Sequence, residues 1–169
     1  GRLTRWKGQE MFIEALNLII KNHSKNNFHA IILGSDQGRN VYSKKISLLV
    51  ERYRLSRKIT FIKNCREMPL AYKIADIAIS SSIEPEAFGR VAVEAQAMGK
   101  PIVASSIGGS KETIVNNKSG LLYKPADARE LARIINKLME MDKESLNLMG
   151  EEGRKNVEKK FNVDQMCQT

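Results

Sequence analysis

Cysteine, long hydrophobic runs and paired aspartates are scarce or missing in this chain of 169 residues. Its two cysteines, Cys65 and Cys167, lie too far apart in the sequence to form a metal-binding motif, and we expect both to be reduced thiols. No apolar run approaches the ~20 residues that a membrane-spanning helix needs. The first residues lack the pattern of a secretory signal peptide. These absences predict a globular domain without a disulfide framework or a membrane span.

Positive charge is in excess, with 28 Lys and Arg residues against 19 Asp and Glu residues and a net charge of +9. This excess fits three kinds of partner: nucleic acid, an anionic membrane surface or a phosphorylated small molecule. Aromatic residues are scattered rather than interleaved with basic ones, as base stacking would require. Nucleic acid is therefore not an expected partner.

Apolar residues at helical spacing alternate along the chain with short, continuous apolar runs. The pattern predicts helices over 9–22, 41–53, 69–75, 88–98, 110–115, 126–141 and 144–161, and strands over 28–33, 59–62, 76–80, 101–104 and 120–123. Such alternation predicts a single α/β domain over residues 1–169. We expect a Rossmann-like, doubly wound, mainly parallel sheet with helices on both faces.

Ligands of such sheets bind beyond the carboxyl ends of the strands, so the residues there are candidates for a site. Residues 1–8 carry Arg2, Arg5 and Lys7 just before a helix, which suits an anion but also fits a basic arm in solvent. The glycine loop at 33–38 permits close approach of a ligand or is a plain turn. Its spacing is not that of a dinucleotide site.

Two glutamates stand out in the segment that follows the third predicted strand. We expect Glu86 at the start of a helix and Glu94 within it, so that both can face one side. Glu94 lies among apolar residues, where a carboxylate is costly to bury without a partner. The alternatives are a helix-capping carboxylate for Glu86 and an ion pair at the core edge for Glu94.

Several segments together, in this order, resemble a known family. They are Gly1-Arg2-Leu3 with Lys7-Gly8, Leu33-Gly34, residues 86–95 (EAFGRVAVEA), residues 99–104 (GKPIVA), Gly108-Gly109 with Glu112, and Ser119-Gly120-Leu121-Leu122. This arrangement resembles the C-terminal nucleotide-sugar domain of family four glycosyltransferases, which are retaining enzymes with the GT-B fold. The resemblance covers nearly the whole chain.

The resemblance implies a role for each matching residue. Arg2 and Lys7 would hold the donor diphosphate, Glu86 would contact the hydroxyls of the donor sugar, and Glu94 would bind both ribose hydroxyls. The first two and Glu86 are the expected catalytic residues. Further donor contacts are expected at the nucleobase and along the loop beside the sugar and phosphate: Gly34, Lys63, Asn64, Ala87, Phe88, Gly89 and Arg90.

No Asp-x-Asp motif occurs in the sequence, so we expect a metal-independent transfer without a cofactor. The leaving diphosphate would instead be stabilised by Arg2, Lys7 and a helix N-terminus. Two other functions remain open at this point. One is half of a nucleotide-sugar epimerase or phosphorylase, and the other is a non-enzymatic basic module that docks on a membrane or on nucleic acid.

Members of the family have two similar domains, and this chain resembles the second of them. The resemblance implies an N-terminal acceptor domain as a partner, with a UDP- or GDP-sugar as donor and a saccharide or lipid-linked acceptor. We expect a role in the synthesis of cell-envelope polysaccharide or lipopolysaccharide, in the cytoplasm or peripherally at the inner face of the membrane. The 169 residues alone are expected to bind a nucleotide sugar weakly and to be inactive.

Overall fold

The computed structural model of the chain describes residues 1–22, 27–38 and 40–161, so that Cys167 lies outside the described residues. The strands are β1 (Ala30–Leu33), β2 (Ile59–Ile62), β3 (Ala78–Ser80), β4 (Ile102–Ser105) and β5 (Leu121–Tyr123). The helices are α1 (Gln9–Asn22), α2 (Asn40–Arg52), α3 (Met68–Ile74), α4 (Arg90–Ala97), α5 (Ser110–Thr113), α6 (Ala128–Glu140) and α7 (Lys143–Lys160), and a 3₁₀ turn spans Arg5–Lys7. Every predicted helix and strand is present, with its ends displaced by two residues at most.

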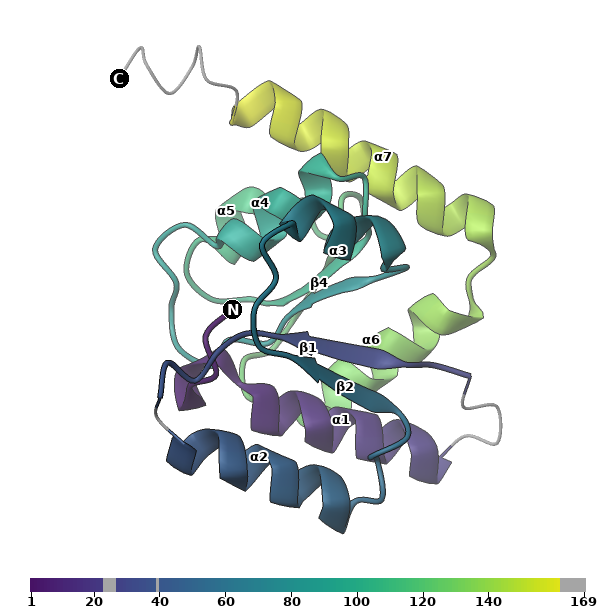
Figure 1. Ribbon diagram of the computed structural model, residues 1–169. Coiled ribbons are helices and arrows are strands. Elements are labelled where there is room, and N and C mark those ends of the chain that lie inside the picture. The colour runs from purple at the N-terminus through teal and green to yellow at the C-terminus, as the bar shows by residue number, and fades with distance from the viewer. Residues whose placement is uncertain (23–26, 39, 162–169) are drawn as a thin grey trace.

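All strand pairs are parallel, which confirms the predicted α/β class. The strands form two hydrogen-bonded groups, β1-β2 and β3-β4-β5. Ala30 stands opposite Ile59 in the first group, and Val103 stands opposite Leu121 in the second. In Figure 1, α1 and α2 lie below the strands while α3 and α4 lie above them. Helices therefore cover both faces, as the alternation of elements predicts.

Side-chain and backbone signals fix the ends of several helices. Asp127 accepts a hydrogen bond from the Glu130 N–H at 2.9 Å and so caps α6, and Asp142 caps α7 by accepting from the Ser145 N–H at 2.7 Å. Gly99, with a φ of 64°, follows the end of α4 in the left-handed conformation expected of it. These local devices explain why the predicted helix boundaries are close to the observed ones.

The core has two parts. The larger part lies between the strands, α1 and α6, and the smaller one is built around β3, β4 and α4. Every residue of β4 is buried, as expected for a strand covered on both faces. That expectation is wrong for β1, where Ile31 is 42% exposed. β1 belongs to a sheet of only two strands, which has fewer neighbours to cover it.

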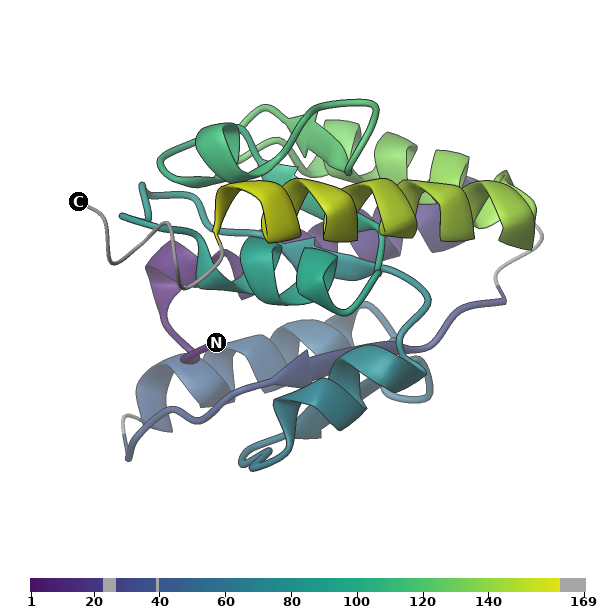
Figure 2. The same ribbon diagram turned by 90° about the horizontal axis from the view of Figure 1, so that it is seen from above.

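The closing helix α7 runs across α4, as Figure 2 shows from above. Asn156 of α7 donates hydrogen bonds to the Gln96 Oε1 at 3.0 Å and to the Thr113 carbonyl oxygen at 2.9 Å. These bonds tie α7 to both α4 and α5 and so hold the segment that carries Glu94. Within the described residues, no helix has the length and apolar character that crossing a membrane requires.

Candidate functional site

The first eight residues lie between the carboxyl ends of β1 and β3. The Gly1 nitrogen donates to the Leu33 carbonyl oxygen at 2.8 Å, at the end of β1. On the other side, the Ser81 hydroxyl donates to the Lys7 carbonyl oxygen at 2.9 Å, just after β3. This segment is therefore held at the edge where ligands of such sheets bind, and it is not a basic arm in solvent.

Gly8 lets this segment lie close to the loop after β3. Its φ is 69°, in the left-handed region, and a Cβ at this position would overlap the carbonyl oxygen of Ser81. The Trp6 carbonyl oxygen also accepts from the Ile83 N–H at 2.8 Å. A glycine is needed here because the backbones of the two segments touch.

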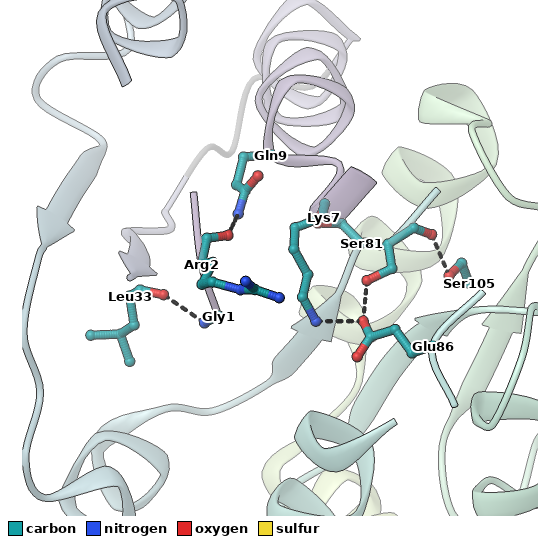
Figure 3. A network of polar contacts seen from close by, with 9 residues as sticks. Gly1, Arg2, Lys7, Gln9, Leu33, Ser81, Glu86 and Ser105 are labelled. Carbon is teal, nitrogen blue, oxygen red and sulfur yellow. Dashed lines mark hydrogen bonds and ion pairs between the residues drawn. The ribbon is translucent and has the colours of Figure 1, made fainter. Parts of the chain in front are cut away.

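Lys7 and Glu86 form an ion pair at the centre of this region (Figure 3). The Lys7 Nζ lies 2.7 Å from the Glu86 Oε1, and the two side chains are only 15% and 14% exposed. The Ser82 hydroxyl donates to the same carboxylate oxygen. Burial acts to raise the pKa of Glu86, but the hydrogen bonds from Lys7 and Ser82 outweigh it, so that the pKa is lowered. Glu86 is therefore a carboxylate at neutral pH.

Trp6 brings Arg2 and Lys7 together. The Lys7 Nζ lies 4.4 Å from the centroid of the Trp6 ring, and the Arg2 guanidinium carbon lies 5.9 Å from it. The Gln9 amide donates to the Arg2 carbonyl oxygen at 2.9 Å. In Figure 3 the Arg2 side chain points toward the space beside Lys7 and Glu86. Two cations and one carboxylate thus border the same space.

Glu86 lies in a loop rather than at the start of a helix, contrary to the prediction. The helix α4 begins at Arg90, because Gly89 adopts a left-handed φ of 70° just before it. The loop rests on Gly109, whose N–H donates to the Glu86 carbonyl oxygen at 2.8 Å. A Cβ at Gly108 would overlap the Glu86 backbone, so the paired glycines let the two loops pack together. Glu86 does not cap α4, whose first residue lies four positions later.

Glu94 faces outward from α4. The sequence predicts apolar surroundings for it, but the structure exposes it. Its buried neighbours Ala92 and Ala95 point to the core, whereas Glu94 is exposed. The Tyr72 hydroxyl donates to the Glu94 Oε2 at 3.0 Å. Among the described residues Glu94 forms no ion pair, so the alternative of an ion pair at the core edge is wrong.

Lys7 and Glu86 come from distant parts of the sequence, the first loop and the loop after β3, and they meet in this region as an ion pair.

A cavity of about 480 Å³ opens next to these charges. Arg2, Gly34, Lys63 and Asn64, all predicted donor contacts, line it. The cavity lies beyond the carboxyl ends of β1 and β2. Its remaining walls come from the end of β1, the neighbouring loops and the start of α3: Gly1, Leu33, Ser35, Gln37, Cys65, Arg66 and Met68.

The other predicted contacts, Ala87 to Arg90, lie on the loop that leads into α4. The Phe88 ring stacks edge-on against Phe161 at 5.5 Å between centroids, so this side chain packs against the end of α7. The N-terminus of α4 leaves backbone N–H groups without helical partners. Arg90 is the first residue of α4 and is exposed.

Three residues of the site are not predicted from the sequence: Trp6, Tyr72 and Ser82. Trp6 could be found as the aromatic residue between two cations, because it lies four residues after Arg2 and one before Lys7. No sequence signal connects Tyr72 with Glu94. Within residues 1–22, 27–38 and 40–161, no group of three or more His, Cys, Asp or Glu side chains is arranged to hold a metal ion.

Comparison with known proteins gives one family. The sequence profile of "Glycosyl transferases group 1" matches residues 1–156. A D-inositol 3-phosphate glycosyltransferase of Corynebacterium urealyticum is 33% identical over 145 residues, which are 84% of this chain and 34% of that protein. The capsular polysaccharide biosynthesis glycosyltransferase CapM of Staphylococcus aureus is 26% identical over 161 residues, 95% of this chain and 40% of that protein.

A solved structure agrees with these matches. Alr3699/HepE of Anabaena, crystallised in complex with UDP-glucose, superposes with a TM-score of 0.90 and 31% sequence identity. The alignment covers 99% of this chain and 45% of that one. The chain therefore spans between a third and a half of the length of these similar proteins.

Proposed function

Because this chain belongs to the glycosyl transferases group 1, we propose that it is the donor-binding domain of a retaining glycosyltransferase. Its donor is a nucleotide-diphosphate sugar, and the UDP-glucose in the similar Anabaena structure favours a UDP-sugar over a GDP-sugar. The sugar is a hexose that passes to the hydroxyl of an acceptor. The observation that carries this proposal is the meeting of Lys7, Arg2 and Glu86 at the carboxyl ends of the strands.

The charges at this edge suit the reaction. When the bond between the anomeric carbon and the diphosphate oxygen breaks, the electron pair stays on the diphosphate and its negative charge grows. Arg2 can donate two parallel hydrogen bonds to phosphate oxygens, and Lys7 adds a compact charge. Trp6 holds both cations in place before the donor arrives. Preorganised cations of this kind lower the barrier to departure of the leaving group.

The two carboxylates suit the hydroxyls of the donor. Glu86 is ionised and fixed by Lys7 and Ser82, so it can accept hydrogen bonds from the sugar. Glu94 is exposed and can accept from the two adjacent hydroxyls of the ribose. The cavity beside Gly34 and Asn64 then takes the nucleobase.

The acceptor is proposed to bind mainly outside this chain, since the chain spans less than half of the proteins it matches. An N-terminal domain would supply that half of the site, and the 169 residues alone would show no transfer. A saccharide or lipid-linked acceptor in cell-envelope polysaccharide synthesis fits the similarity to CapM. The cytoplasmic location and the peripheral membrane contact stay predictions, as does the absence of a nucleic-acid partner.

A binding measurement on the 169-residue chain tests the proposal. We expect UDP and UDP-glucose to bind by calorimetry and to raise the midpoint of thermal unfolding, because a ligand of the native state stabilises it. Glu94→Ala should abolish most of this binding. Glu158→Ala removes another exposed carboxylate, one on α7 that pairs with Arg154, and should change nothing. Undiminished UDP binding by Glu94→Ala, or none by the unaltered chain, would contradict the proposal.

A further inference from the structure

The hydroxyl of Tyr72 is the one hydrogen-bonding partner that Glu94 has among the described side chains. It donates to the Glu94 Oε2 at 3.0 Å and thereby joins α3 to α4. Tyr72 is 7% exposed, whereas the carboxylate that it contacts belongs to an exposed residue. A buried donor thus reaches from the core to an acceptor at the surface.

We propose that Tyr72 is a positioning residue, which holds the Glu94 carboxylate in the orientation that binds the ribose hydroxyls. This inference rests on the role of Glu94 in the proposed function. A carboxylate has about four lone-pair directions, so one bond from Tyr72 leaves the other oxygen and further directions free for a diol. An exposed glutamate without such a bond samples several rotamers, and binding would have to select one of them.

The surroundings of Tyr72 fix its hydroxyl. Its ring belongs to the smaller core, which also contains Ala92 and Ala95 of α4 and Ile102 of β4. Burial and then the charge of Glu94 raise the pKa of Tyr72, so that the hydroxyl keeps its proton and remains a donor.

The position of α3 connects this bond to the cavity. Met68 is the first residue of α3 and also lines the cavity beside Asn64, and Tyr72 lies one helical turn later. The same short helix therefore borders the space assigned to the nucleobase and orients the carboxylate assigned to the ribose. The nucleobase and the ribose are adjacent in a nucleoside, so one helix can lie near both.

The test compares UDP with 2′,3′-dideoxy-UDP, which lacks both ribose hydroxyls, on the 169-residue chain. Tyr72→Phe keeps the ring in the core and removes only the hydroxyl. We expect UDP affinity to fall about five- to tenfold, with the affinity for the dideoxy nucleotide unchanged. In a Glu94→Ala background the same substitution should have no further effect on UDP binding.

Tyr123→Phe is the matched control. The Tyr123 hydroxyl is buried and, within the described part of the chain, has no hydrogen-bond partner. Its removal should leave the affinities for both nucleotides unchanged. Should Tyr72→Phe fail to fold, Tyr72→Met, which also lacks the hydroxyl and adapts to a buried site, must show the same loss of preference for UDP.

Two results would overturn the inference. If Tyr72→Phe only lowers the unfolding temperature, or lowers the affinities for both nucleotides equally, Tyr72 has a structural role alone. The proposed function would still stand in that case, provided that Glu94→Ala loses UDP binding. If Glu94→Ala binds UDP like the unaltered chain, or if that chain does not prefer UDP over the dideoxy nucleotide, the assignment of Glu94 to the ribose fails and the inference fails with it.

Discussion

Replacing Lys7 with methionine isolates what one ammonium contributes to phosphate binding. The ammonium has three N–H donors, and Glu86 takes one of them at 2.7 Å, so that two remain for diphosphate oxygens. A hydrogen bond to a charged group contributes about 1.5–3 kcal/mol, and the low exposure of Lys7 limits screening by salt. We therefore expect the affinity for UDP to fall about 10- to 100-fold in Lys7→Met. Uridine carries no phosphate, and its affinity should not change.

Calorimetry with UDP, and competition with uridine, would measure both affinities in the same variant. Lys155→Met is the control: it removes the same charge from an exposed pair with Glu152 on α7 and should leave both ligands unaffected. An equal loss for UDP and uridine would show that Lys7 maintains the shape of the site instead of binding phosphate. An equal loss in Lys155→Met would show a general effect of net charge.

Two further predictions concern stability. Gly8→Ala should lower the free energy of unfolding in urea by more than Gly38→Ala does, because both positions have a positive φ but only at Gly8 would a Cβ overlap another backbone; equal losses would contradict the close packing described for Gly8. The pKa of Glu86 is lowered in the folded chain, so its ionised form stabilises the fold at pH values above the ordinary pKa of 4.5. This contribution is lost as the pH falls through the lowered pKa of the folded chain. The stability difference between the unaltered chain and Glu86→Gln should therefore shrink on acidification below about pH 4.5, and a difference that stays constant would refute the assigned cause.

Helices and strands are predictable here because their signals are local. The apolar spacing within 9–22 and 126–141 defines two amphipathic helices, and Gly99 ends a third in the conformation expected of it. The division of the strands into two hydrogen-bonded groups could not be predicted in this way, because strands of three or four residues carry no sequence information about their partners. Nothing local marks Ile31 as the exposed residue of β1.

In the site, too, features with a local sequence signal are predictable and contacts between distant segments are not. The rule that ligands bind at the carboxyl ends of parallel strands leads to the loops that hold Lys7 and Glu86, and the structure joins these two residues in an ion pair. The prediction that Glu86 lies at the start of a helix is wrong because Gly89 interrupts the apolar pattern and adopts a left-handed conformation, so that the helix starts after Gly89. The bond between Tyr72 and Glu94 joins two helices that are separated in sequence, and no periodic pattern encodes such a contact.

The most direct test of the account is where UDP binds on the chain, followed by amide chemical shifts during a titration. We predict shifts at Gly34, Asn64 and Glu86, which surround the cavity and the ion pair. A second cavity of about 550 Å³, between α1 and α6, offers a basic alternative site beside Arg129 and Arg133. Shifts confined to α1 and α6, or no shifts at saturating UDP, would contradict the claim that the carboxyl ends of the strands form a nucleotide-sugar site.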